Sequence, residues 1–190
     1  MAWLKKVWHF IWHDDSLASW LVNLVLAFVL VKYLIYPALG LLFGTSFPIV
    51  AVVSGSMEHD TLGFDAWWER SGSWYEQREI SKDYFSDFPF HNGFRMGDIM
   101  ILRGIAPKDI KVGDVLVYES SRHPNPIIHR VVDVQDINET YSFQLKGDHN
   151  YSPDNDLVTA EHLRRTGKAV MRIPYLGWVK IWFVRLLGLN

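Results

Sequence analysis

The stretch PIVAVVSGSM, residues 48–57, decides the architecture, because a long uncharged run ends here and a β-patterned region begins. Lys32 is the only charged residue between Ser16 and Met57, so this part of the chain can cross a hydrocarbon core of about 30 Å. The apolar residues 48–53 are typical of a short strand bounded by small polar residues. The sequence therefore predicts a membrane anchor that leads directly into a folded β domain.

Residues 16–44 are predicted to form one transmembrane signal anchor. The run is too long for a cleaved signal sequence and has no small-residue cleavage site, so we expect it to stay uncleaved. Lys5 and Lys6 precede it, whereas no basic residue follows it before Arg70, which places the N-terminus in the cytoplasm by the positive-inside rule. The domain after the anchor is then extracytoplasmic.

The residues before the anchor, 1–15, have the pattern of an amphipathic cytoplasmic helix that lies in the headgroup layer. Basic residues and histidines fill its polar side, and its apolar side carries Trp3, Leu4, Val7, Trp8, Ile11 and Trp12. The alternative is an ordinary helical start to the anchor, with tryptophan at the membrane interface.

The composition fits one modest domain plus membrane segments, because 49% of the 190 residues are hydrophobic and the formal net charge is only -2. The 19 basic and 21 acidic residues are scattered, whereas a nucleic-acid partner requires a clustered basic excess, so we expect none. The absence of cysteine excludes disulfides and thiol redox chemistry, and we expect no metal and no cofactor.

Residues 45–172 are predicted to form a compact antiparallel β domain, so the fold class is mainly β. Short apolar runs separated by Gly, Pro and Asn indicate strands at 48–53, 98–103, 114–119, 127–134 and 141–146. A Gly-Asp pair, which is a common turn signal, leads into the second and the third of these strands.

Two segments depart from the β pattern. Residues 60–94 form an insertion rich in Trp, Tyr and Phe, with spacing that favours short helices and a small core of their own. This insertion is either a lid or membrane-resting flap over the site or a segment that simply packs on the β domain. The apolar tail 173–190 contains Lys180 and Arg185 and is shorter than the roughly 20 residues of a span, which favours a membrane-surface helix over a second span.

A candidate nucleophile lies in Ser54-Gly55-Ser56-Met57, where the chain leaves the membrane. A serine hydroxyl is a weak nucleophile and needs a base within hydrogen-bond reach. His129 is the histidine that lies inside a strand pattern, on the same face as Ile127 and Val131. A histidine in this position is either the base or a hydrogen-bonded core residue.

A carboxylate behind the histidine would fix its tautomer through the other ring nitrogen. The segment 146–156 directly follows a strand and supplies Asp148, Asp154 and Asp156. Such residues are also common in turns, and their spacing does not choose among them.

Five motifs follow one another along the chain. They are Ser54-Gly55-Ser56-Met57-Glu58, Gly97-Asp98 at the start of a strand, Ile128-His129-Arg130-Val131-Val132, Lys146-Gly147-Asp148-His149-Asn150 and Pro174-Tyr175-Leu176-Gly177. In this order they resemble signal peptidase I of the archaeal and endoplasmic-reticulum type. The similarity covers most of the chain from the anchor to the tail.

The resemblance implies a Ser-His-Asp endopeptidase that removes signal peptides, with Ser56 as nucleophile and His129 as general base. The bacterial branch of the family has a lysine at the position of His129. The second aspartate of the family pattern falls on Asp154, which we assign to the triad, and Asp148 would orient His129 or shape the loop. By resemblance to the bacterial branch, the Ser54 hydroxyl and the Ser56 backbone N–H would hold the oxyanion.

The implied substrate is an extended segment just past a hydrophobic helix, with small residues at the first and third positions before the cut. An extended peptide can pair with a sheet edge and point alternate side chains into pockets. We expect strand 48–53 to be this edge, with shallow apolar pockets formed by Ile49, Ala51, Val53, Ile99 and Ile101.

The expected partners are signal-peptide-bearing preproteins and membrane lipid, with the translocon or accessory subunits as further candidates. The expected location is the cell membrane or the endoplasmic-reticulum membrane, with the catalytic domain on the outer face.

Two other functions stay open at this point. A catalytically inactive, membrane-anchored β module could bind or recruit partners with the same motifs, although it would not require Ser56, His129 and an aspartate together. A Ser-Lys protease that uses Lys111 or Lys146 is the third hypothesis, and neither lysine occupies the strand position of His129.

Overall fold

The computed structural model describes residues 2–120, 123, 125–163, 167–186 and 188. The chain divides into two compact units, Met1–Leu42 and Phe43–Asn190. The first unit is helical, and the second contains the β sheet and all five motifs found in the sequence.

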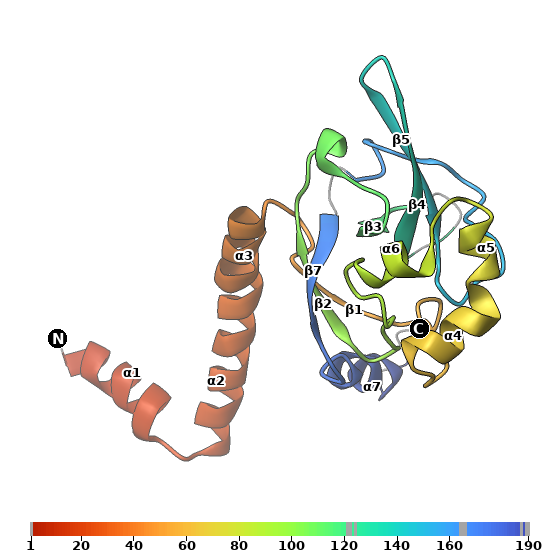
Figure 1. Cartoon of the computed structure of the whole chain (residues 1–190). Helices are drawn as coiled ribbons and strands as arrows, with labels where there is room; N and C mark the ends of the chain where they lie inside the picture. Colours follow the sequence, from red (N-terminus) through yellow and green to blue (C-terminus); the bar gives the residue numbers. More distant parts are fainter. Residues whose placement is uncertain (1, 121–122, 124, 164–166, 187, 189–190) are drawn as a thin grey trace. The chain divides into compact units, whose positions relative to one another are not determined.

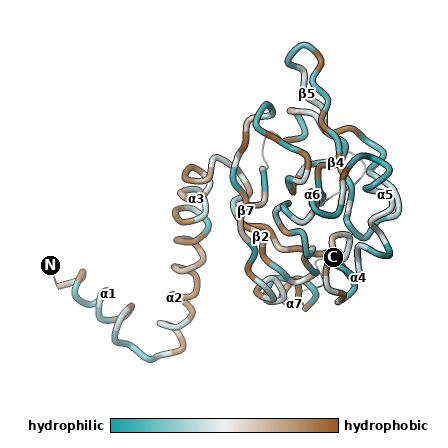
Figure 2. The backbone as a smooth tube through the Cα atoms, in the orientation of Figure 1, coloured by the Kyte–Doolittle hydropathy of each residue, from teal (hydrophilic) through white to brown (hydrophobic). Residues whose placement is uncertain are grey.

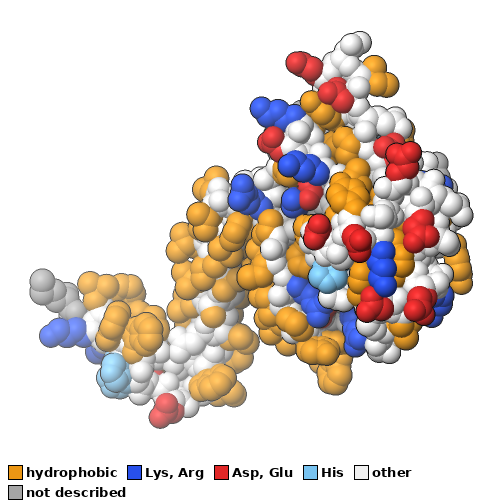
Figure 3. All heavy atoms as spheres, viewed as in Figure 1, with side chains coloured by type: hydrophobic (Ala, Val, Ile, Leu, Met, Phe, Trp, Pro, Cys, Tyr) orange, Lys and Arg blue, Asp and Glu red, His pale blue; other side chains and the backbone are white. Residues whose placement is uncertain are grey.

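The first unit contains one helical stretch that can cross a membrane by its length and composition. The helix α2 (Leu17–Leu30), a π-helical turn (Val31–Ile35) and α3 (Tyr36–Phe43) run on without a break, and Leu17–Phe43 has a mean hydropathy of 2.1. Its 27 residues span about 40 Å, more than the roughly 30 Å of a hydrocarbon core. Most residues of α2 and α3 are hydrophobic (Figure 2), and hydrophobic side chains predominate on the face of these helices seen in Figure 3, as expected for a helix in contact with lipid.

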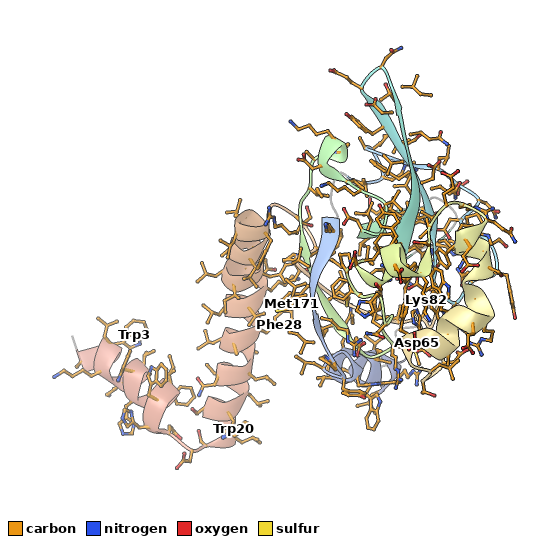
Figure 4. The ribbon with its side chains drawn as sticks, in the orientation of Figure 1. Trp3, Trp20, Phe28, Asp65, Lys82 and Met171 are labelled. Carbon is orange, nitrogen blue, oxygen red and sulfur yellow. The ribbon has the colours of Figure 1, made fainter. Side chains whose placement is uncertain are left out.

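A fixed turn joins this stretch to the preceding helix α1 (Ala2–His13). Ser16 caps α2 by accepting a hydrogen bond from the backbone N–H of Ser19. The hydroxyl of Ser19 donates to the Phe10 carbonyl at 2.6 Å, and the Asn23 amide donates to the Ile11 carbonyl at 2.9 Å. The tryptophans of α1, including Trp3 (Figure 4), remain exposed within this unit.

The second unit is built on a seven-stranded sheet with the order β1-β2-β7-β3-β4-β5-β6 (Figure 1). Neighbouring strands pair in antiparallel fashion, which confirms the predicted mainly β fold. The strands are β1 (Ile49–Ala51), β2 (Ile99–Arg103), β3 (Val115–Tyr118), β4 (Ile127–Ile137), β5 (Thr140–Lys146), β6 (Val158–Thr159) and β7 (Gly167–Ile173).

Two similar turns lead into β2 and β3, at the predicted Gly-Asp pairs. Gly97 and Gly113 have positive φ angles of 91° and 95°, which an L residue with a side chain rarely adopts. The carboxylates of Asp98 and Asp114 then accept hydrogen bonds from the backbone N–H three residues earlier, at 2.9 and 3.1 Å. Each turn therefore depends on both members of its Gly-Asp pair.

Side chains on the two faces of the sheet form separate cores. One core contains Val52, Met57, Phe94, Met100, Leu102, Val115, Val117 and Ala169. The other contains Ile110, Leu116, Tyr118, Val131, Phe143, Leu145, Val158 and Leu163. Residues alternate between the faces along β4, so His129 and Val131 point to one side and Arg130 points to the other.

The predicted aromatic insertion forms three short helices, α4 (Phe64–Ser71), α5 (Ser73–Glu76) and α6 (Lys82–Ser86). Its core, which we call the insertion core, consists of Trp67, Trp68, Tyr75, Ile80, Phe85, Phe88 and Val132. Because Val132 belongs to β4, the insertion packs on the sheet. An exposed ion pair between Lys82 Nζ and Asp65 Oδ1, 2.7 Å apart, joins α6 to α4 (Figure 4).

The tail contains a helix, α7 (Trp178–Leu186), within the predicted range 173–190, of which residues 187, 189 and 190 lie outside the described residues. Just before α7, the Gly177 N–H donates to the Gly97 carbonyl at 2.8 Å, so two of the five sequence motifs meet. Ile181 is buried and Trp178 and Val184 are partly buried, whereas Val179, Trp182, Phe183 and Leu186 are exposed.

Candidate active site

The candidate nucleophile lies in a tight turn directly after the edge strand β1. The Glu58 N–H donates to the Gly55 carbonyl at 3.0 Å, and the fully buried Met57 anchors the turn in the sheet core. The hydroxyl oxygens of Ser54 and Ser56 lie 3.3 Å apart on the accessible side of the turn. A buried methionine next to an accessible serine thus fixes the backbone while leaving the Ser56 hydroxyl free to rotate.

The candidate base, His129, is buried on β4 opposite Leu116 of β3. Its Nδ1 lies 2.9 Å and 2.7 Å from the two carboxylate oxygens of Asp154. An ionised carboxylate only accepts hydrogen bonds, so Nδ1 carries the proton in the neutral ring. The other nitrogen, Nε2, is then the proton acceptor, which is the tautomer that a general base requires.

Asp154 is itself held from three directions. The backbone N–H of Asp154 donates to the Leu145 carbonyl at 2.8 Å, and the side-chain amide of Gln144 donates to the backbone carbonyl of Asp154 at 2.6 Å. The Tyr118 hydroxyl donates to its carboxylate at 2.8 Å. Burial and the charge of Asp154 raise the pKa of Tyr118, so the phenol stays protonated and keeps donating.

Gly147 brings the nucleophile and the base together. A Cβ atom placed on Gly147 would lie 2.6 Å from the Ser56 carbonyl oxygen and 2.9 Å from His129 Nε2. The next residue but one, His149, donates its backbone N–H to the same Ser56 carbonyl at 2.9 Å. The backbone carbonyl of Ser56 and Nε2 of His129 therefore face the same glycine, at a place where any side chain would collide with both.

Asp148 lies on the opposite side of the loop from Asp154 and is almost completely buried. Its carboxylate binds Arg130 through Nε at 2.9 Å and through a terminal nitrogen at 2.8 Å, and it also contacts His59 and Tyr75. Burial alone would raise the pKa of Asp148, but the charge of Arg130 and these hydrogen bonds hold it well below its usual range. Asp154, and not Asp148, is the aspartate in contact with the ring of His129.

Lys146 is the second lysine considered as an alternative base. It pairs with Arg130 across β4 and β5, so its side chain lies on the face away from His129. Its Nζ donates to the Gly147 carbonyl at 3.0 Å and to the Tyr75 hydroxyl at 3.3 Å. It does not bond to the Ser56 hydroxyl, whose hydrogen-bond partner among the described residues is Ser54. Burial lowers the pKa of Lys146 to about 8.

This lowered pKa predicts a pH-dependent stability. Between about pH 8 and 10 the unfolded chain holds the Lys146 proton more tightly than the folded chain, so stability increases with pH. We expect the free energy of unfolding of the wild type, minus that of Lys146→Met, to rise by about 2 kcal/mol from pH 8 to pH 10. Denaturant unfolding in detergent micelles measures this difference.

The matched control is Lys111→Met, because Lys111 is exposed on the same domain. Its difference from the wild type should stay constant over this pH range. A constant difference for Lys146→Met as well would mean that Lys146 keeps an ordinary pKa.

The predicted pocket residues come together on one face beside the nucleophile turn. In the β1–β2 register, Ile49 lies opposite Ile101 and Ala51 opposite Ile99, so these side chains point the same way. Val53 follows two residues after Ala51 and is exposed. The residues between them, such as Val50, pack against the core of the opposite face.

Several residues of the site were not singled out from the sequence. Tyr118 and Gln144 hold Asp154, while Tyr75 and His59 hold Asp148. Tyr118 lies opposite Ile127, on the face of His129, so the strand register would have revealed it. The other three contacts depend on how loops and the insertion fold back, which no sequence spacing indicates.

The arrangement can carry out proton transfer between a serine hydroxyl and a neutral histidine. Once the Ser56 hydroxyl is within hydrogen-bond reach, His129 Nε2 can accept its proton, with Asp154 stabilising the resulting imidazolium. Among the residues that the structure describes, no group of three or more His, Asp or Glu side chains is placed to hold a metal ion.

No protein-family profile matches the chain. It is 27% identical over 156 residues to the signal peptidase complex catalytic subunit SEC11 of Fusarium vanettenii, and the aligned region covers 78% of this chain and 71% of the relative. Subunit SEC11C of Homo sapiens is 27% identical over 154 residues, covering 78% of this chain and 63% of the relative. Subunit SEC11 of Scheffersomyces stipitis is 28% identical over 165 residues, covering 83% and 79%.

Proposed function

Since the chain is a relative of the endoplasmic-reticulum type of signal peptidase I, we propose that it is a membrane-bound serine endopeptidase that cleaves N-terminal signal peptides from secreted and membrane preproteins. In this proposal Ser56 is the nucleophile, His129 the general base and Asp154 the third member of the triad. Asp148 supports the loop next to them.

One observation carries the proposal: His129 is bound to Asp154 through Nδ1 and directs Nε2 toward Gly147, beside Ser56. Ser56 attacks the carbonyl before the scissile bond while His129 takes its proton, and His129 then delivers that proton to the leaving amine. The Ser56 backbone N–H and the Ser54 hydroxyl stabilise the oxyanion. A partner-binding module would not need a histidine in this tautomer next to an accessible serine.

The edge strand β1 supports an extended substrate. The Val52 N–H and the Pro48 carbonyl both bond toward β2, so by alternation the backbone groups of Ile49, Ala51 and Val53 face the open edge. A peptide that pairs with this edge places alternate side chains over the apolar face of Ile49, Ala51, Val53, Ile99 and Ile101. The shallow face explains a preference for small residues at two positions that are two apart.

The candidate span supports a single-pass protein in the cell membrane or the endoplasmic-reticulum membrane, with its catalytic domain outside the cytoplasm. The helix α1, with Lys5 and Lys6, is the cytoplasmic segment that contacts lipid. The relatives' names refer to a signal peptidase complex, which supports accessory subunits as partners, and the translocon is a further candidate.

The test is cleavage of a preprotein by the full-length protein in proteoliposomes. We expect one new N-terminus after a small residue just past the hydrophobic helix, identified by mass spectrometry. Replacing that small residue by a bulky one should lower kcat/KM by about 10²-fold or more, because the bulky side chain does not fit the shallow face. Absence of cleavage, with tight binding of the same preprotein, would favour the non-catalytic binding module.

A further inference from the structure

The insertion reaches the active-site loop through Asp148. The hydroxyl of Tyr75, in α5, donates to Asp148 Oδ1 at 3.2 Å. His59, just before the insertion, contacts Asp148 Oδ2 at 3.2 Å and stacks on Trp67 of α4 with ring centroids 3.8 Å apart. Two of the four contacts to this buried carboxylate therefore depend on the insertion.

The insertion also holds the arginine that completes the network. Arg130 donates to the carbonyl oxygens of Pro89 at 2.8 Å and Phe90 at 3.0 Å, and its guanidinium lies 4.8 Å from the ring centre of Phe85. These three residues belong to the insertion. Arg130 follows His129 directly on β4, so the insertion is linked to the base as well as to the loop.

Tyr75 is fixed in place by packing. It has no exposed surface, and its ring contacts Trp67, Trp68 and Phe85 with centroid distances of 5.9, 5.9 and 4.9 Å. Its hydroxyl accepts from Lys146 while it donates to Asp148. A rigid donor of this kind transmits the position of the insertion to the carboxylate.

Asp148 in turn determines where the loop 147–149 lies. Gly147 on one side of it faces both the Ser56 carbonyl and His129 Nε2, and His149 on the other side donates to that carbonyl at 2.9 Å. A shift of Asp148 would therefore move the two residues that set the gap between nucleophile and base. Misplacement of reacting groups by about 1 Å can cost about 10²-fold in rate.

We propose that the aromatic insertion, residues 60–94, is a positioning element: Tyr75, with His59, holds Asp148, and Asp148 fixes the loop between Ser56 and His129. Tyr75 is a positioning residue, because it contacts neither of them. This inference rests on the proposed function and assigns the insertion a part in the same reaction.

The test compares Tyr75→Phe with Tyr84→Phe in the full-length protein. Tyr75→Phe removes one hydroxyl and keeps the ring in the insertion core, while Tyr84 is a half-exposed tyrosine of the same insertion. We expect Tyr75→Phe to lower kcat for preprotein cleavage about 10-fold with KM within about twofold, and Tyr84→Phe to change neither.

Amide exchange of His149 is the second measurement, because it reports the hydrogen bond to Ser56 without requiring activity. We expect about 10-fold faster exchange in Tyr75→Phe and no change in Tyr84→Phe. Unchanged exchange, or a lower melting temperature with unchanged kcat, would overturn the positioning role. A wild type that cleaves nothing would refute the proposed peptidase, and His149 exchange would still decide the link from Tyr75 to the loop.

Discussion

Replacing Ser56 by alanine is expected to lower kcat for preprotein cleavage by at least about 10⁴-fold, because the reaction loses its nucleophile. The fold should be unchanged, since the Ser56 side chain has only the hydroxyl of Ser54 as a hydrogen-bond partner among the described residues. Single-turnover cleavage in proteoliposomes measures the rate, and the melting temperature checks the fold.

Two serine variants provide the comparison. Ser54→Ala should lose about 10²- to 10³-fold, the usual effect of removing one oxyanion donor. Ser152→Ala should keep full activity, because Ser152 is an exposed serine of the loop after β5. Full activity in Ser56→Ala would end the peptidase hypothesis as stated.

Replacing Asp154 by asparagine is expected to lower kcat by about 10³- to 10⁴-fold while the protein stays folded. The amide can donate a hydrogen bond to His129 Nδ1, which favours the ring tautomer with its proton on Nε2. Nε2 then cannot accept the proton of Ser56. The contacts that hold the loop, from Leu145 and Gln144 to the Asp154 backbone, do not involve the carboxylate and should remain.

The other two aspartates of the loop are the matched controls for this variant. Asp156→Asn should retain kcat within about threefold. Asp148→Asn should lower the free energy of unfolding by about 3 to 5 kcal/mol, because the buried Arg130 loses its charge partner, and should lower kcat by about 10-fold through the loop, far less than Asp154→Asn. Equal losses of kcat in folded Asp154→Asn and Asp148→Asn would show that a single-aspartate triad is too simple.

The local pattern of the sequence was sufficient to predict most of the strands. Strands β1 to β5 fall within or close to the predicted ranges, because alternating apolar residues and Gly-Asp turns act over a few positions. The central strand β7 was not predicted. In Gly167-Lys168-Ala169-Val170-Met171-Arg172-Ile173, glycine and two basic residues interrupt the apolar run. The two basic residues pair with Asp114 and Asp98, which is a tertiary effect.

The chain by itself determined the long apolar helix, the β class, the turn that presents Ser56 and the strand that carries His129, because each depends on neighbours within a few residues. Only the tertiary structure separates Asp148 from Asp154, since the loop after β5 folds back so that the Asp154 carboxylate reaches His129 and the Asp148 carboxylate reaches Arg130. It also brought Tyr75 to Asp148 across 73 positions. Contacts between residues so far apart in the sequence arise from tertiary packing, and the spacing of residues along the chain does not predict them.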